Sequence, residues 1–335
     1  MELELFLTTL QQVAVLLFFI FLGYFFKRKE IINDSGKKVL AKLLTCLFAP
    51  CYSVISLSSV INIQNIVEYL AVFLAGIGVA VFFVLLSHPL ARIFYKDKAH
   101  RNILKYAFSF GNIGYFGYPV VAAIFGVEMR AMMMLFCVPM SILIYTFGYY
   151  VLTTDVSESA ENKQRTIVEK LSFLWSPMLL GAILGVVVGL VTSGFGFSLP
   201  TIITDVLTVA GNCQSAPAML LTGAVLAGVP FGKLFTDLKP YLIGVVRLLI
   251  LPVIIGVIFV IIHICGVSGQ TFALIFRLSV IVAAMPVGMN TVVFPESAGQ
   301  DSTEGAKSCF ISYVMALACM PVVFMIMESL ALGMI

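Results

Sequence analysis

The sequence predicts an all-α polytopic membrane protein with ten transmembrane helices, arranged as two inverted five-helix repeats. Three observations predict this fold: an extreme composition, apolar runs of membrane-spanning length, and basic residues confined to alternate connections. Of the 335 residues, 61% are hydrophobic and 11% are charged, whereas soluble domains average about 45 to 50% apolar and about 25% charged residues. The mean hydropathy of +1.07 is spread over the whole chain, so most residues must face lipid or other membrane helices.

Ten apolar runs have the length of about 20 residues that a helix needs to cross a hydrocarbon core of about 30 Å. The first five are predicted at 5–26, 39–60, 66–87, 103–125 and 131–152. The second five are predicted at 173–193, 200–228, 240–265, 270–295 and 308–332. One long polar stretch separates the two sets. We therefore expect a first five-helix repeat at 1–153, a cytoplasmic connecting loop at 154–170 and a second five-helix repeat at 171–335.

The positive charges indicate which connections face the cytoplasm. Of the 20 lysines and arginines, all but three fall in or beside the odd-numbered connections. The exceptions are Arg130 on the other side of the membrane, and Arg247 and Arg277 within spans. The positive-inside rule therefore predicts that both termini lie outside. Because each half has an odd number of spans, the halves can share one fold only if an in-plane pseudo-twofold axis relates them.

Several functional classes lack the residues that they need. The net charge of +3 is small, and its one-sided placement does not form a nucleic-acid surface. The seven cysteines have no CxxC spacing and lie mostly in apolar runs, which favours buried thiols. The three histidines, His88, His100 and His263, are far apart, and neither a zinc motif nor a GxxxxGKS or GxxxxGKT phosphate loop is present. The start lacks a basic segment, so the first apolar run is expected to be a retained span.

The fourth and ninth spans contain helix breakers near their centres. The fourth reads FSFGNIGYFGYPVVAAIFG and places there Gly111, Asn112, Gly114, Gly117 and Pro119. The ninth reads VAAMPVGMNTVVFPESAG and places there Pro286, Gly288, Asn290, Thr291 and Pro295. Proline removes a backbone donor and glycine weakens helix propensity, so both segments are expected to unwind.

Unpaired backbone groups at membrane depth are tolerated only where protein or a water-filled cavity satisfies them. Paired interrupted helices at matching positions of inverted halves indicate a transporter binding site. The positive N-terminal ends of the half-helices suit a carboxylate, and Asn112, Asn290 and Thr291 can add neutral hydrogen bonds. The alternative is that these glycines and prolines only kink the helices or let them pack closely.

The same motifs resemble those of the auxin efflux carrier family, which includes the plant PIN-type transporters and many bacterial carriers. The resemblance covers essentially the full length and rests on FGNIGYFGYP at 110–119, on Ala-Pro at 49–50 and 216–217, and on RLSVIVAAMPVGMNTVVFPE at 277–296. It implies two inverted repeats, an elevator-type motion of a transport domain against a scaffold, and a substrate site where spans four and nine cross. It also implies an organic anion as substrate, which is auxin in plants and a small carboxylate such as malate or malonate in some bacterial members. The segment at 154–170 is far shorter than the cytoplasmic loop of long PIN proteins, which favours a small carboxylate over auxin.

Charged residues within spans are costly and are functional candidates. Arg277, on the first half of the ninth span, could attract the anion, pair with an acid or snorkel to the outer surface. Asp205, near the outer end of the seventh span, could bind a proton, pair with Arg277 or begin a helix at the interface. Arg247 lies seven residues beyond Pro240, and we expect it to snorkel to the cytoplasmic face. Glu296 is placed at the cytoplasmic end of the ninth span.

The prediction is a secondary active transporter of the cell membrane for small organic anions, acting in efflux or exchange by elevator-type alternating access. The predicted substrate-binding residues are Asn112, Gly114, Pro119, Pro286, Gly288, Asn290 and Thr291. Arg277 and Asp205 are the candidates for anion or proton coupling, with sodium coupling also open and no cofactor or metal expected. The expected partners are a small organic anion and the lipid bilayer, with a homodimer as a further option and no nucleic acid.

Two other functions use the same sequence features differently. One is a ligand-binding membrane sensor on the same fold that does not transport, which an appended soluble signalling domain would distinguish. The other is a membrane-embedded enzyme, which needs paired catalytic groups at one depth. Asp205 has no second aspartate within the spans, so we do not expect an enzyme.

Overall fold

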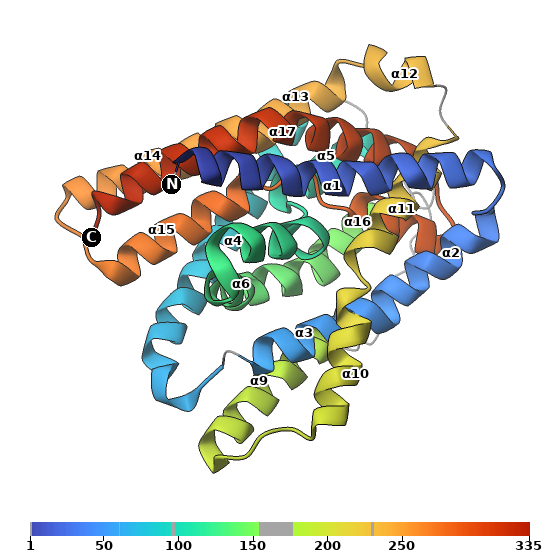
Figure 1. Ribbon diagram of the computed structural model, residues 1–335. Helices are drawn as coiled ribbons and strands as arrows, with labels where there is room; N and C mark the ends of the chain where they lie inside the picture. Colours follow the sequence, from blue (N-terminus) through green and yellow to red (C-terminus); the bar gives the residue numbers. More distant parts are fainter. Residues whose placement is uncertain (1, 60, 95–97, 154–176, 229–230) are drawn as a thin grey trace, which may run out of the picture.

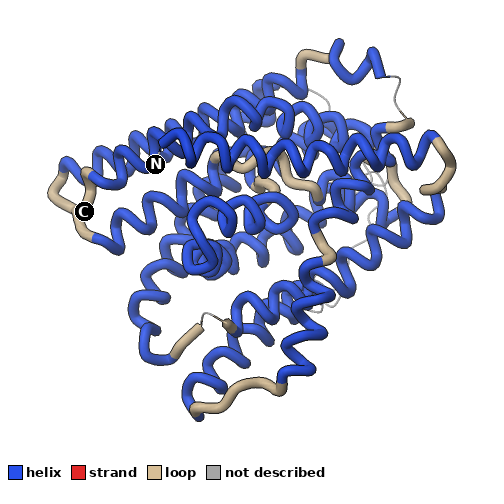
Figure 2. The backbone as a smooth tube through the Cα atoms, in the orientation of Figure 1, coloured by secondary structure: helices blue, strands red, loops and turns tan. Residues whose placement is uncertain are grey.

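The computed structural model describes residues 2–59, 61–94, 98–153, 177–228 and 231–335. In this part of the chain Figure 2 shows only helices and loops, so the all-α prediction is confirmed. Among the described residues, six helices are long and apolar enough to cross a membrane: Phe6–Arg28, Asp34–Ser58, Tyr69–Phe94, Ile113–Leu143, Lys239–Ile264 and Thr303–Leu332. Two shorter apolar helices are Ile183–Phe195 and Gln270–Ala283. The connecting loop predicted at 154–170 lies outside the described residues.

Helices lie over all ten predicted ranges. The first half contains α1 (Glu2–Arg28), α2 (Asp34–Leu43), η1 (Leu44–Phe48), α3 (Ala49–Ser58), η2 (Ile63–Asn65), α4 (Ile66–Phe94), α5 (Lys98–Ser109), η3 (Ile113–Gly117), α6 (Tyr118–Leu143), η4 (Ile144–Gly148) and α7 (Tyr149–Thr153). The second half contains α9 (Pro177–Phe195), α10 (Thr201–Asn212), α11 (Ser215–Leu226), α12 (Phe231–Thr236), α13 (Lys239–Val245), η7 (Val246–Ile250), α14 (Leu251–Ile264), α15 (Gln270–Ala283), α16 (Asn290–Ala298) and α17 (Thr303–Leu332). The number of membrane crossings and the inverted relation of the two halves stay predictions.

Prolines follow π-helical turns in three places, Pro50 after η1, Pro119 after η3 and Pro252 after η7. A proline ring has no N–H and clashes with the carbonyl four residues earlier, and the wider π turn relieves this clash. The helix therefore continues through Pro50. The second Ala-Pro pair behaves differently, because the chain breaks at Cys213 and Gln214 before α11 begins.

The fourth and fifth predicted spans are joined by a single residue. Gly126, inside α6, has φ 87° and ψ 173° and divides this element into two helices at a kink. A positive φ of this kind is accessible to glycine at little cost and strained for other residues. The connection expected at 126–130 is therefore shorter than predicted.

The helices pack in groups around the interrupted segments (Figure 1). Helix α1 packs against α11 and α17, and α4 packs against α5 and α6. Helices α3, α9 and α10 pack together at the lower edge of the view in Figure 1, away from α13 and α14. Both termini lie at the same end of the molecule in this view, and their placement relative to the membrane stays a prediction.

Candidate functional site

The two interrupted helices meet at a short antiparallel backbone bridge. The break between α5 and η3 contributes Gly111, which pairs with Val287 in the break between α15 and α16. Beside this pair, the N–H of Asn112 donates to the carbonyl of Pro286 at 2.8 Å. The predicted unwinding is confirmed at Gly111 and at Pro286, whereas Pro119 and Pro295 lie within α6 and α16. Each break therefore satisfies some of the backbone groups that the other leaves unpaired, as membrane depth requires.

Two glycines allow this close approach of the two backbones, which we call the crossing. A Cβ atom on Gly288 would lie 2.9 Å from the carbonyl oxygen of Phe110, and one on Gly111 would lie 2.6 Å from the Cβ of Met285. Neither position accepts a side chain without movement of the backbone. Gly114 is different, because no atom lies within 4 Å of its Cβ position. It therefore faces open space beside the crossing.

Asn112 is committed to contacts within the protein. It is 2% exposed, and its Oδ1 accepts a hydrogen bond from the N–H of Tyr115 at 3.2 Å. Its Nδ2 donates to the hydroxyl of Tyr313 on α17. Asn112 is thus the N-cap of η3, which satisfies a backbone donor at the start of the second half-helix.

Thr291 is also engaged within the protein. Its hydroxyl donates to the carbonyl of Gly288 at 2.8 Å and lies 3.2 Å from the sulfur of Cys309. The hydroxyl therefore stabilises the first turn of α16 and its contact with α17.

Asn290 begins α16 and keeps one amide atom unpaired. Its side chain is hydrogen-bonded to that of Tyr106, while its Oδ1 is buried without a partner. Among the described residues, the hydroxyls of Ser109 and Tyr115 are also buried and unpaired, and both flank the first break. Unpartnered buried polar atoms are rare in native proteins. Three of the four such atoms among the described residues belong to residues in or beside the two breaks, and the fourth is Nε of Arg130.

The negative ends of the half-helices are capped by Arg247 of η7. This side chain is fully buried. Its Nε donates to the carbonyl of Met285 at 2.9 Å, its Nη1 to Phe108 at 3.1 Å and its Nη2 to Val282 at 2.9 Å. The prediction that Arg247 snorkels to the cytoplasmic face is wrong. The side chain turns inward because the last carbonyls of α5 and α15 lack helical partners and attract a cation.

Three further residues at the crossing were missed by the sequence analysis. Ser312 of α17 accepts a hydrogen bond from the N–H of Val287 at 3.1 Å, next to Tyr313. Gln214, in the break before α11, donates to the carbonyl of Gly114 at 3.2 Å. The available signal was weak: each is a hydrogen-bonding side chain within an otherwise apolar span.

The two charged candidates lie apart from this network. Arg277 Nε contacts both carboxylate oxygens of Glu328 on α17, at 3.0 and 3.1 Å. Asp205 is exposed on α10, which packs against α3. The acid that pairs with Arg277 is therefore Glu328, and the pairing with Asp205 that we considered is not formed. The sequence offered acids in several spans, and only the packing of α15 on α17 selects one of them.

The remaining predicted residues lie at or beside the crossing. Pro286 and Gly288 are buried within the second break, and Pro119 is half-buried at the start of α6. A separate cavity of about 440 Å³ lies where α3 and α9 end and α10 begins, with Ser59 and Asn62 in its lining. None of the predicted substrate-binding residues lines this cavity.

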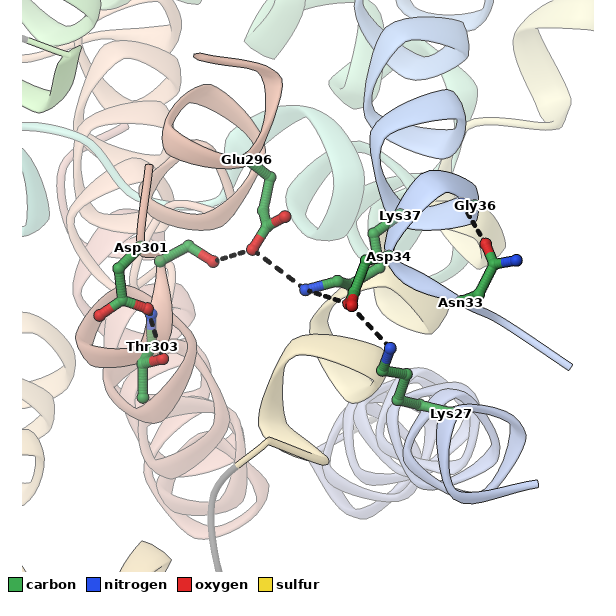
Figure 3. Close-up of polar contacts among 9 residues, drawn as sticks. Lys27, Asn33, Asp34, Gly36, Lys37, Glu296, Asp301 and Thr303 are labelled. Atoms are coloured by element: carbon green, nitrogen blue, oxygen red, sulfur yellow. Dashed lines mark hydrogen bonds and ion pairs between the residues drawn. The ribbon is translucent and has the colours of Figure 1, made fainter. Parts of the chain in front are cut away.

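Charged side chains connect the C-terminal part of α16 to α2 (Figure 3). Glu296 accepts a hydrogen bond from Ser302 at 2.8 Å and pairs with Lys37 of α2 at 3.5 Å. Lys37 also lies 3.4 Å from Asp34, which pairs with Lys27 of α1 at 2.8 Å. Charges of opposite sign therefore alternate from α1 through α2 to the helix that Asn290 begins.

Replacing Lys37 with methionine is expected to lower the stability of this conformation. The side chains of Lys37 and Glu296 are 16% and 11% exposed, so the change leaves a largely buried carboxylate without its cation. We expect a loss of about 1 kcal/mol and a fall of about 2 °C in Tm, measured by thermal unfolding in detergent. Lys38→Met is the matched control, because Lys38 is exposed on the same helix. Equal melting of the two variants would show that the contact contributes nothing.

Comparison with known proteins assigns the chain to a family. A family model described as membrane transport protein matches residues 8–324, which include both breaks and every residue of the crossing. A search of curated proteins found no match. The family match covers the motifs at 110–119 and 277–296 on which the predicted resemblance rests. The chain therefore belongs to this family of membrane transport proteins, which is that of the auxin efflux carriers.

Proposed function

We propose that the protein is a secondary active transporter that moves small organic anions such as carboxylates across the cell membrane, in efflux or exchange. The observation that supports this most is the bridge between Gly111 and Val287, which joins two interrupted helices at one point. Interrupted helices that meet in this way provide substrate and ion sites in transporters. Membership of a membrane transport family supports the same function.

The anion would bind at the N-terminal ends of η3 and α16. Both ends carry partial positive charge, which suits a carboxylate. The unpaired Oδ1 of Asn290 would accept a hydrogen bond from a hydroxyl or N–H on the same ligand. The open space beside Gly114 gives the rest of the ligand room. A small hydroxycarboxylate such as malate satisfies all three features.

Transport would follow from alternating access of the crossing to the two sides of the membrane. In the elevator form, a transport domain that carries the crossing slides against a scaffold, and the contact between Lys37 and Glu296 breaks in each cycle. The proposal includes ten spans in two inverted repeats, with both termini outside. An inside-negative potential gives about 2.3 kcal/mol per charge per 100 mV in the outward direction. This is sufficient to drive efflux of an anion without a coupled ion.

Flux into proteoliposomes tests the proposal. Labelled malate, malonate and indole-acetate are offered in turn while pH, sodium and voltage gradients are varied one at a time. We expect saturable malate flux that follows the voltage, with protein-free liposomes as the control. If none of the three is transported but one raises the Tm of the protein, the sensor function replaces the carrier.

A further inference from the structure

Arg247 is a buried cation without a carboxylate partner. It is 0% exposed, and among the described residues its guanidinium forms no ion pair with an acid. Its three nitrogen atoms are instead used by three backbone carbonyls, as described above, and one face lies 5.6 Å from the ring centroid of Phe83. An arginine remains charged in proteins. A charge in this position must therefore be balanced by something other than an acid.

The ends of the interrupted helices supply this balance. Each helix C-terminus carries roughly half a negative charge, because its last carbonyls have no helical partner. Phe108 belongs to the last turn of α5, and Val282 to the last turn of α15, so one guanidinium caps both ends. Two such ends together match about one positive charge. The two half-helices are therefore held at the crossing by a cation that they share.

In transporters with broken helices, carbonyls at half-helix C-termini and in the unwound segments coordinate the coupling cation. The carbonyls of Phe108, Val282 and Met285 have this position here and are occupied by a cation attached to the chain. We propose that Arg247 is the resident cation of the crossing, which takes the place of a bound sodium ion and leaves the opposite, N-terminal ends free to hold the anion. This inference rests on the proposed function, because it concerns the coupling and the charge selectivity of the same site.

The contact with Gly111 links the guanidinium to the anion side. A Cβ atom on Gly111 would overlap Nη2 of Arg247, so the cation packs directly against the bridge. The next residue, Asn112, caps the N-terminal end at which the anion binds. By neutralising the two C-terminal ends, Arg247 removes the negative potential that would otherwise repel an anion one residue away. The crossing is then selective for anions without the help of a dissolved cation.

The first test uses the ligand-free wild-type protein and needs no knowledge of the substrate. Its Tm is measured in sodium chloride and in choline chloride of equal ionic strength, and we expect the same value in both. For Arg247→Ala we expect a lower Tm that millimolar guanidinium chloride partly restores, because the free ion can occupy the same carbonyls. Arg92→Ala is the matched control, since Arg92 is exposed at the end of α4 and guanidinium should not raise its Tm. A wild-type Tm that depends on sodium, or a folded Arg247→Ala that guanidinium does not stabilise, overturns the proposal.

The second test measures labelled malate binding to the same proteins. Wild type is expected to bind malate equally in sodium and choline, and Arg247→Ala about tenfold more weakly, with recovery in guanidinium. If Arg247→Ala does not fold, Arg247→Lys keeps the charge and is expected to bind malate without sodium. A folded lysine variant that requires sodium for binding overturns the proposal. Failure of all anion binding in the wild type contradicts the proposed function, while the Tm experiment still decides the role of Arg247.

Discussion

Alanine in place of Gly111 is expected to prevent the crossing from forming and to abolish transport. The added Cβ would overlap the guanidinium of Arg247 and lie 2.6 Å from the Cβ of Met285. Neither neighbour can move cheaply, because the guanidinium is held by three carbonyls and Met285 lies in the second break. Overpacking at buried positions costs about 1 to 3 kcal/mol, and here the loss of the Arg247 hydrogen bonds is added to that cost. We expect a loss of more than about 3 kcal/mol and little monodisperse protein after detergent extraction.

Two further glycines serve as controls for this result. Gly256 of α14 and Gly114 both have no atom within 4 Å of the Cβ position, so alanine at either should leave the Tm unchanged or slightly higher, since alanine favours helix. Melting and malate flux are measured for all three variants. The sterically open Gly114 also separates folding from transport, because a Cβ there enters the space assigned to the ligand. If Gly111→Ala has the Tm and the malate flux of wild type, the close approach of the two backbones at Gly111 is not needed for folding or transport.

The sequence was sufficient to locate the two breaks because the signal for them is local. Proline and glycine act on their own segment of helix, so Gly111 and Pro286 indicate unwinding without any knowledge of their neighbours. The shortening of the turn at Gly126 and the continuation of the helix through Pro50 were harder to predict. The first depends on whether one glycine with a positive φ can join two helices at a kink, and the second on whether a π turn can relieve the clash of the proline ring. Composition determines neither.

The role of Arg247 could not be predicted, because it depends on which element η7 faces. Its position in the predicted span suggested an arginine near the cytoplasmic surface. Position along a span cannot distinguish a side chain that faces lipid from one that faces the ends of other helices. The partner of Arg277 could not be predicted for the same reason, since Glu328 lies 51 residues away on α17. Ser312 and Tyr313 carry no periodic pattern that separates them from ordinary polar residues of a packed helix. Long-range packing decides all of these contacts.

Alanine in place of Asn290 is expected to weaken anion binding and transport while the protein still folds. Its Oδ1 has no partner within the protein, so the side-chain hydrogen bond that truncation removes is the one to Tyr106. A ligand whose hydroxyl or N–H donates to this oxygen loses a neutral hydrogen bond worth about 0.5 to 1.5 kcal/mol, or about twofold to tenfold in affinity. Malate binding to the purified protein measures this loss, and the Tm without ligand should fall only by the contribution of the hydrogen bond to Tyr106.

Asn112→Ala is the informative comparison, because the sequence treats the two asparagines alike and the structure distinguishes them. Both polar atoms of the Asn112 amide are used within the protein: Oδ1 accepts from the N–H of Tyr115, and Nδ2 donates to the hydroxyl of Tyr313. Its loss removes an N-cap, at a cost of about 0.5 to 2 kcal/mol, and leaves a buried tyrosine hydroxyl without this donor. Asn112→Ala should therefore lower the Tm of the ligand-free protein more than Asn290→Ala, which loses only the hydrogen bond to Tyr106.

These two variants together determine which half of the crossing holds the ligand. If Asn290→Ala loses affinity for malate and has the smaller loss of Tm, the ligand lies at the start of α16, and the hydrogen bonds of Asn112 serve to hold η3 against α17. If instead both variants lose stability equally and Asn290→Ala keeps its affinity for malate, the unpaired oxygen faces only protein and the ligand must be held by backbone N–H groups alone. The second outcome would still agree with a transporter that binds its anion at the crossing, because helix N-termini bind anions without a particular side chain. It would contradict recognition of the ligand by the Asn290 side chain.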